Sequence, residues 1–193
     1  MFSTLRCGMA ALALTAMALP ALGESLSFKD ARKAVPKGSR TVATLIDTSF
    51  LDDKQQAIVK SLEANIPYYG ALALTPSEGL FVEWLNAAGQ HHSIEAARAA
   101  ALDHCEANRK RASAPCVVVL EVAPRGAKDG VALSLSAPAN EVLRDEYRKL
   151  KSPKAMAISE STGAFGIAAG DAAGAIKTCG AAGATDCKVV VAD

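Results

Sequence analysis

The spacing of apolar residues predicts a strand and then a helix early in the chain. Thr41–Asp47 (TVATLID) is rich in β-branched and apolar residues, which is typical of a strand. The next segment, residues 52–66, places apolar residues four positions apart on one helical face. They are Ile58, Leu62 and Ile66. Because Asp52 is followed three positions later by Gln55, which together resemble a capping box, we expect the helix to begin there.

The same two patterns return later in the chain. Val131–Ser136 (VALSLS) alternates apolar and polar residues, which predicts a half-buried strand. Residues 139–150 carry one apolar stripe and predict a helix. The stripe consists of Leu143, Tyr147 and Leu150. Before the first strand, residues 24–40 form an N-terminal extension. There Ser27–Val35 is expected to form a short helix, with Ser27 as its N-cap and Asp30 at its third helical position.

Two segments of the chain are related by an offset of 84 residues. Ala71–Phe81 (ALALTPSEGLF) and Ala155–Phe165 (AMAISESTGAF) are identical at five of eleven positions, and three more are conservative. Each segment is followed by an Ala-rich helical stretch, a cysteine, a short loop, a second cysteine and a run of valines. Recurrence of both the motif order and the cysteines indicates an internal repeat.

Each half of the chain therefore follows the order strand, helix, strand, strand, helix, strand. This order predicts an α+β protein with two tandem ferredoxin-like βαββαβ halves, residues 41–123 and 131–193. The alternative is one mixed sheet shared by both halves. The central hairpins are expected to turn at Thr75–Gly79 and Ser159–Gly163, with Pro76 at the first corner and each glycine in the left-handed region.

Residues 1–23 match a secretory signal peptide. One positive charge precedes the uncharged run Cys7–Leu19, and small residues follow before Glu24. The run is too short to span a membrane, and no later stretch is long and apolar enough. Cleavage would remove Cys7 and the charge of Arg6, leaving 20 basic and 20 acidic residues. A neutral chain has no long-range attraction for nucleic acid, so we expect no nucleic-acid partner and no membrane span.

Four cysteines remain after cleavage: Cys105, Cys116, Cys179 and Cys187. An even number of cysteines in an exported chain predicts disulfides, although four cysteines allow three connectivities. In each half a cysteine at the end of an Ala-rich helix precedes one that opens a Val-rich strand. This shared plan favours pairing within each half, Cys105 with Cys116 and Cys179 with Cys187.

The second hairpin AISESTGAFGIA, the Ala-rich helix, the paired cysteines and the ending CKVVV resemble a bacterial secreted domain of unknown function, number 4189. The resemblance is clearest over Lys154–Asp193 and weaker over Gly70–Val122. It implies export and a disulfide-tied fold, and it transfers no catalytic residue. The whole chain also resembles short exported bacterial proteins labelled 5-aminolevulinate synthase, which implies a pyridoxal-phosphate enzyme. No lysine here stands in a recognisable cofactor context, so we expect no cofactor.

The two copies differ in length at one place, which is where we look for a site. Ten more residues separate phenylalanine from cysteine in the first copy than in the second. The extra residues are expected within Val82–Ser93 and the start of the following helix. This stretch holds Glu83, the single tryptophan Trp84, and the adjacent His91 and His92. Loops carry function more often than cores, although the bland interpretation is a packed tryptophan and solvated histidines.

The aromatic pair Tyr68-Tyr69 precedes the first hairpin and completes the candidate binding residues. The leading hypothesis is an exported, non-enzymatic binding or interaction protein for an unknown protein or small-molecule ligand. The competing hypothesis is a small hydrolase that uses His91 or His92 with Glu83 or Asp103. Metal or haem binding is a weaker alternative, because no recognised ligand spacing is present. The sequence does not define the oligomeric state.

Overall fold

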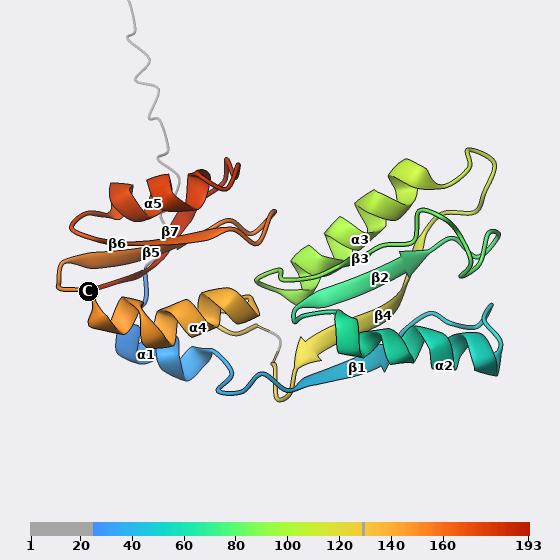
Figure 1. The fold of residues 1–193 in the computed structure, drawn as a ribbon, viewed down its shortest axis with the longest axis horizontal. Coiled ribbons are helices and arrows are strands. Elements are labelled where there is room, and N and C mark those ends of the chain that lie inside the picture. Colours follow the sequence, from blue (N-terminus) through green and yellow to red (C-terminus); the bar gives the residue numbers. More distant parts are fainter. Residues whose placement is uncertain (1–24, 129) are drawn as a thin grey trace, which may run out of the picture.

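A computed structural model describes residues 25–128 and 130–193. The signal peptide predicted at residues 1–23 lies outside this part. The described residues form an α+β fold with five α-helices and two separate antiparallel sheets. Figure 1 shows the two sheets side by side along the long axis of the molecule. The alternative of one mixed sheet shared by both halves is therefore wrong.

The first half contains a four-stranded sheet in the order β1-β4-β2-β3. Its strands are β1 (Thr41–Leu45), β2 (Gly70–Leu74), β3 (Ala87–Ala88) and β4 (Val117–Pro124). Its helices are α2 (Asp53–Ser61), continued by a 3-10 turn at Leu62–Asn65, and α3 (Ile94–Asn108). The strand, the helix and the capping box predicted before residue 66 are confirmed. Ile58, however, is 43% exposed, and the neighbouring Val59 faces the core instead.

The second half contains a three-stranded sheet in the order β6-β5-β7. Its strands are β5 (Lys154–Ile158), β6 (Phe165–Ala169) and β7 (Lys188–Ala192). Its helices are α4 (Ala137–Asp145), continued by a 3-10 turn at Tyr147–Lys149, and α5 (Ala172–Gly180). The order matches β3-β2-β4 of the first half, and the register shift between Leu72 and Ala73 recurs between Met156 and Ala157.

Helices cover both faces of each sheet (Figure 1). In β2, Ala71 and Ala73 pack with α3, whereas Leu72 and Leu74 pack in the cluster that contains Val59 of α2. In β5, the central strand of the second half, Ala155 and Ala157 likewise pack with α5, whereas Met156 and Ile158 pack in the cluster that contains Leu143 of α4. A ferredoxin-like α+β arrangement has its helices segregated to one face, so that arrangement is not confirmed.

The hairpin turns have the predicted geometry. The amide of Gly79 donates to the Thr75 carbonyl at 3.1 Å, and that of Gly163 donates to the Ser159 carbonyl at 3.0 Å. Both glycines have positive φ, +72° and +75°. The ten extra residues of the first copy are not confined to one loop. They are shared by the segment between Gly79 and β3, the loop before α3, and α3 itself, which has 15 residues where α5 has nine.

The strand predicted at Val131–Ser136 is wrong. The alternation does reflect burial, because Leu133 and Leu135 are buried in the core. The segment nevertheless has no partner in either sheet. The position beside β7 is taken by Leu26, whose amide donates to the Val190 carbonyl at 2.9 Å and whose carbonyl accepts from Ala192 at 3.0 Å.

The N-terminal extension packs on the second half. Ser27 caps helix α1 (Phe28–Ala34) through the amide of Asp30, as predicted. Ala31 and Val35 are buried in the cluster that also holds Leu143 and Tyr147 of the predicted apolar stripe. The described part of the chain, from residue 25, therefore begins on the second half and crosses to the first at β1.

Both predicted disulfides are confirmed. Cys105 bonds to Cys116 and Cys179 bonds to Cys187, with separations of 11 and 8 residues. Each bond ties the C-terminal part of the Ala-rich helix to the residue just before β4 or β7. Between residues 25 and 193, the described helices are all too short or too polar to cross a membrane.

Candidate functional site

Four of the six predicted site residues meet where the two halves join. Tyr69 and His91 exchange backbone hydrogen bonds of 3.3 and 3.1 Å. The carbonyl of Tyr68 accepts from the first residue of α4, Ala137, at 3.4 Å. The Tyr68 hydroxyl accepts a hydrogen bond from Asn140 of α4 at 3.1 Å. These residues therefore connect the start of β2 with the second half.

Trp84 and Glu83 lie apart from this junction, in the segment between β2 and β3. Glu83 is exposed, and Trp84 is half-buried beside the ring of His104, with 6.5 Å between ring centroids. Nε2 of His104 lies 2.9 Å from the carbonyl oxygen of Trp84. The interpretation of Trp84 as a packed residue therefore accounts for its contacts with α3.

His92 is a buried link between the halves. The Ser136 amide donates to Nδ1 at 3.0 Å, so Nδ1 is an acceptor and Nε2 carries the proton. Nε2 then donates to the Ala164 carbonyl, also at 3.0 Å. Burial lowers the pKa of His92, against the opposing effect of the Ala164 carbonyl. Both ring nitrogens are thus occupied by backbone groups, as expected of a structural histidine.

His91 is also buried, and its Nδ1 has no hydrogen-bond partner. Burial lowers the pKa of its imidazole. Neither His91 nor His92 hydrogen-bonds a carboxylate among the described residues, and Glu83 and Asp103 are both exposed. The acid–base pair that the hydrolase hypothesis needs is therefore not assembled at this junction.

No three histidine, cysteine, aspartate or glutamate side chains of the described chain converge in a way that could hold a metal ion. A protein metal site usually needs three or four such ligands. The geometry of residues 25–128 and 130–193 thus offers the metal hypothesis no ligand set.

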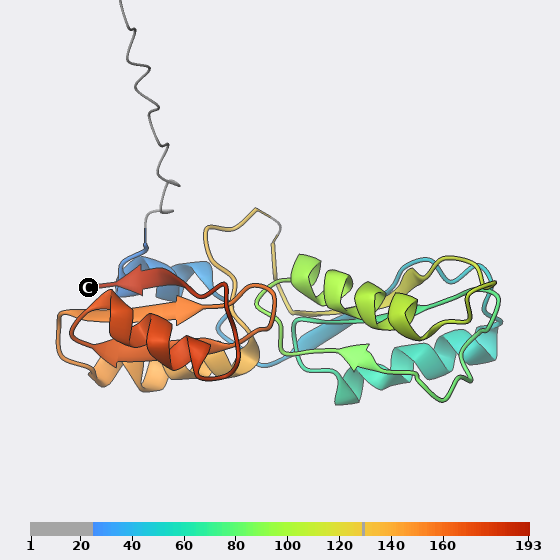
Figure 2. The same ribbon diagram turned by 90° about the horizontal axis from the view of Figure 1, so that it is seen from above.

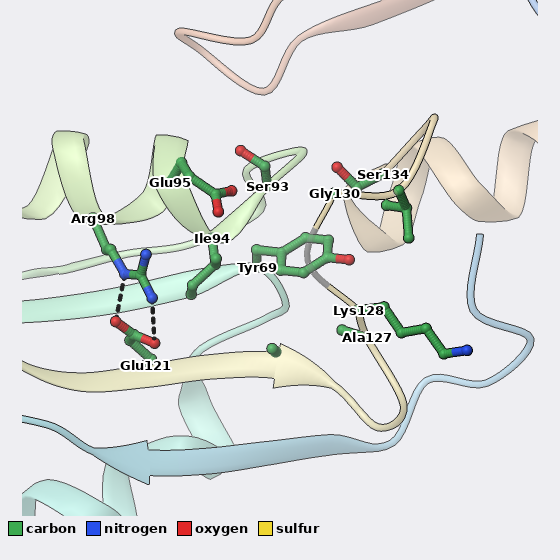
Figure 3. Close-up of a pocket in the computed structure, with 12 residues that line it drawn as sticks. Tyr69, Ser93, Ile94, Glu95, Arg98, Glu121, Ala127, Lys128, Gly130 and Ser134 are labelled. Carbon is green, nitrogen blue, oxygen red and sulfur yellow. Dashed lines mark hydrogen bonds and ion pairs between the residues drawn. The ribbon is translucent and has the colours of Figure 1, made fainter. Parts of the chain in front are cut away.

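Tyr69 forms the inner wall of a cavity of about 330 Å³. The cavity lies between the first turns of α3, the end of β4 and the linker to the second half (Figure 3). The polar lining residues are Tyr69, Ser93, Glu95, Arg98, Glu121, Lys128 and Ser134. A volume near 300 Å³ is at the lower end of the range for small-molecule sites.

Tyr69 is 5% exposed as a residue, and its hydroxyl forms no hydrogen bond with a described residue. The hydroxyl oxygen itself is not fully buried, because among the described residues only Nδ1 of His91 is a buried side-chain atom without a partner. Figure 3 shows the hydroxyl pointing away from α3, toward the linker that carries Lys128 and Ser134. Burial raises the pKa of Tyr69, and the nearby Tyr68 and Glu95 raise it further, so the hydroxyl keeps its proton. It is a neutral donor directed into the cavity.

Charged groups line the same cavity. Arg98 and Glu121 form a two-point ion pair across the wall, with Nε–Oε1 and Nη2–Oε2 distances of 2.5 and 2.9 Å (Figure 3). Glu95, in the first turn of α3, and Lys128, on the linker, form no ion pair or hydrogen bond with another described residue. Of the described lining residues, one carboxylate and one ammonium group therefore form no ion pair with another described residue.

A second, more open cavity of about 660 Å³ lies between α3 and the tip of the second hairpin. Its floor is made of alanines of α3, and its rim is acidic. The acidic residues are Glu95, Asp103, Glu160 and Asp186. Asp186 accepts hydrogen bonds from the Ser159 hydroxyl and from the Ser161 amide at 3.1 Å, and the hydroxyl contact in particular lowers its pKa. Asp186 thus supports the hairpin tip.

The geometry defines a class of site: a small polar cavity with fixed charges of both signs and no assembled catalytic pair. Comparison with family models, with curated proteins and with solved structures found no match. The resemblance to domain 4189 and to the proteins labelled 5-aminolevulinate synthase therefore stays a prediction.

Of the cavity's polar residues, the sequence indicated only Tyr69. Glu95, Arg98, Glu121 and Lys128 come from three elements that are distant along the chain. They are ordinary charged residues on a helix, a strand and a linker, and no spacing between them marks a site. Only the aromatic pair before the first hairpin provided a signal.

Proposed function

We propose that this chain is an exported, non-enzymatic protein that binds a small polar molecule in the cavity lined by Tyr69. The observation that carries the proposal is the Tyr69 hydroxyl, a donor that faces the cavity and forms no hydrogen bond with a described residue. Small-molecule sites commonly hold their ligand through a few polar groups that face the cavity, and a hydroxyl without a protein partner is such a group. A ligand or water in the cavity would supply the missing partner.

Export is supported by the pattern of residues 1–23 and by the two disulfides. Disulfides persist in the periplasm and outside the cell, and they are rare in the reducing cytosol. We place the protein in the periplasm or outside the cell on these grounds. The matching strand order, register shift and disulfide in the two halves favour duplication of an ancestral unit. This origin agrees with the resemblance to domain 4189.

The experiment is a ligand screen read by backbone amide NMR on the mature, oxidised protein. The panel contains amino acids, dicarboxylates, amines and neutral sugars. We expect at least one compound to shift the amides of Ser93–Arg98 and of Ala127–Ser134 together, excluding residue 129. Tyr69→Phe should weaken that compound's binding about tenfold, as expected for loss of a buried hydrogen bond.

Tyr147→Phe is the matched control. Tyr147 is buried in the second half, and its hydroxyl already donates within the protein, lying 3.2 Å from the Lys154 carbonyl and 3.1 Å from an Asp193 oxygen. It does not line the cavity, so its removal should leave binding unchanged. Absence of any response at the cavity to the whole panel would refute the proposed function.

A further inference from the structure

We propose that His92 is an acid-sensitive latch between the two halves, and that its protonation lets the second half separate from the first while each half stays folded. This device is distinct from ligand binding in the Tyr69 cavity and does not depend on it. The His92 ring is 1% exposed, and both of its nitrogens contact backbone groups of the second half. The ring therefore belongs to the joint and not to the core of either half.

The contact at Nδ1 exists only while the ring is neutral. Nδ1 accepts the Ser136 amide at 3.0 Å, which requires that the single ring proton be on Nε2. A second proton makes Nδ1 a donor, because both nitrogens of an imidazolium are donors. Protonation therefore removes this hydrogen bond and leaves two N–H groups facing each other in a buried place.

The surroundings from α4 also disfavour a cation at this position. Ser136 is the N-cap of α4, so the positive end of the helix dipole lies at the ring. The first turn of this nine-residue helix carries no acidic side chain to offset it. An imidazolium here gains nothing from α4, whereas water would stabilise it in an open arrangement.

Two carboxylates of the second half act on the ring from a distance, but both have other partners. Glu160 forms an ion pair with Lys188 at 2.7 Å, and Asp186 accepts hydrogen bonds from Ser159 and Ser161. Their charges favour the imidazolium and the adjacent His91 opposes it. Burial outweighs the two carboxylates, so the pKa of His92 is lowered in the closed arrangement.

The halves can separate without breaking the interior of either. Each has its own sheet, apolar cluster and disulfide. Helix α1 packs with the second half, and residues 37–40, which lead from it to β1, are exposed. Relative motion is the usual behaviour of units that are joined by a small interface.

The remaining contacts at the joint are few and local. Tyr68 accepts hydrogen bonds from Ala137 and Asn140 of α4. The hairpin of β5 and β6 extends toward the start of α3 (Figure 1), and its Gly163 lies against Gln90 and His91. None of these contacts supplies an acceptor to a protonated His92 ring, so they do not replace the latch.

The size of the effect follows from proton linkage. Below the pKa of the open arrangement, one histidine raises the ratio of open to closed molecules by at most about tenfold per pH unit. If that pKa is the ordinary value of about 6.5, His92 raises the ratio at most about thirtyfold by pH 5. His91 adds to this, since its buried Nδ1 has no partner and Gly163 covers it in the closed arrangement.

The test follows the mature, oxidised protein between about pH 8 and about pH 5. Ring nitrogen chemical shifts report the protonation of His92, amide nitrogen relaxation reports the tumbling of each half, and small-angle X-ray scattering gives the radius of gyration. As His92 is protonated, we expect the halves to tumble independently and the radius of gyration to rise. The Ser136 amide should exchange faster, while the amides of β2 and β5 stay protected.

Two glutamine variants separate the latch from histidine titration in general. His92→Gln removes the titrating group but keeps a side-chain acceptor and donor, so its ratio of open to closed molecules at about pH 5 should be lower than that of the wild type by about tenfold or more. His104→Gln is the matched control. His104 contacts the Trp84 carbonyl within the first half, so this variant should open as the wild type does.

Three results would overturn the latch. They are an unchanged radius of gyration and unchanged tumbling down to about pH 5, loss of both folds in one step without an open folded state, and opening of His92→Gln at the same pH as the wild type. If His92→Gln does not fold, the wild type decides alone. Its opening must then coincide with protonation of the His92 ring, and midpoints that differ by more than about one pH unit would refute the proposal.

Discussion

Tyr68 and Tyr69 are adjacent and equally buried, but their hydroxyls have different environments. The hydroxyl of Tyr68 is bonded by Asn140, whose side-chain amide also donates to the Pro36 carbonyl. The hydroxyl of Tyr69 faces the cavity and has no such partner. One tyrosine therefore stabilises the junction, and the other leaves a donor available to a ligand.

This difference predicts that the same substitution changes the free energy of unfolding by different amounts at the two positions. Tyr68→Phe should lower the free energy of unfolding by about 1 kcal/mol, because it removes a buried hydrogen bond. Tyr69→Phe should change it by less than about 0.5 kcal/mol, because no protein bond is lost. Urea unfolding of both variants beside the wild type measures the difference. Equal losses in the two variants would show that Tyr69 has a protein partner in solution.

His91 and His92 make stability depend on pH. Burial is the main cause that lowers the pKa of each below the ordinary 6.5. Between the lowered pKa and 6.5 the unfolded chain binds more protons than the folded chain, so stability rises with pH in that window. The contribution is complete above about pH 6.5 and is lost as the pH falls. The charges of Glu160 and Asp186 raise the pKa of His92 and so oppose the effect of burial, whereas the charge of His91 lowers that pKa further.

We therefore expect the free energy of unfolding to fall as the pH is lowered below about 6.5, by at most about 1.4 kcal/mol per pH unit for each histidine. Carboxylates with lowered pKa values, such as Asp186, act only at more acidic pH and do not contribute in this range. His92→Gln should flatten the profile measured by denaturant unfolding. A variant profile parallel to that of the wild type would contradict the assignment.

At the scale of elements, the two hairpins provide an internal control. Gly79 and Gly163 occupy the same turn position with nearly equal φ. A Cβ on Gly79 would meet no atom within 4 Å, whereas one on Gly163 would lie 2.4 Å from the Gln90 carbonyl oxygen. The second hairpin therefore touches the first half through its glycine, beside the His92–Ala164 hydrogen bond.

Glycine can be required at a turn for its left-handed backbone or because there is no space for a side chain, and alanine substitution separates these two reasons. Gly79→Ala should cost about 1–2 kcal/mol, the penalty for an ordinary residue in the left-handed region. Gly163→Ala should cost more than about 3 kcal/mol, because it adds a clash with backbone. The variant should also shift the amide resonances of residues 90–92. Similar costs at the two positions would mean that the halves do not make this contact in solution.

Most of the element order is predictable from local patterns, although the strand expected at Val131–Ser136 does not form and the ferredoxin-like layering is not confirmed. Short sequence patterns predicted the capping box at Asp52, the glycines of the two hairpin turns and both disulfides. The strand sequences GALAL and KAMAI alternate large with small residues, not apolar with polar ones, and all ten residues are buried. Such strands need cover on both faces. This pattern was readable in the sequence and argues against a ferredoxin-like layering.

Long-range partners could not be predicted at the scale of the whole molecule. Leu26 pairs with β7 at the edge of the second sheet, whereas Val131–Ser136, which alternation predicts to be a strand, pairs with neither sheet. Similarly, Glu95 and Lys128 meet Tyr69 only through the packing of α3 and the linker. Figure 2 shows that linker passing between the two halves. The division into residues 41–123 and 131–193 stays a prediction.

The two disulfides should stabilise unequal structures. Each closes a short loop and should contribute about 2–4 kcal/mol, mainly by restricting the unfolded chain. Their separations of 11 and 8 residues imply similar contributions. The structures they support differ, because the second half has three strands and a nine-residue α5, whereas the first has four strands and a 15-residue α3.

Reduction of the whole protein should therefore lower the melting temperature and open the second half first. Hydrogen exchange should accelerate in α5 and β7 before it does in α3 and β4, since the smaller structure has less buried surface to offset the lost cross-link. The double variant Cys179→Ala with Cys187→Ala should reproduce this order. It should also release Leu26, because that residue is hydrogen-bonded to β7.

The matched variant, Cys105→Ala with Cys116→Ala, should leave exchange in β7 unchanged. Faster hydrogen exchange in α3 than in α5 after reduction would contradict the prediction that the second half opens first.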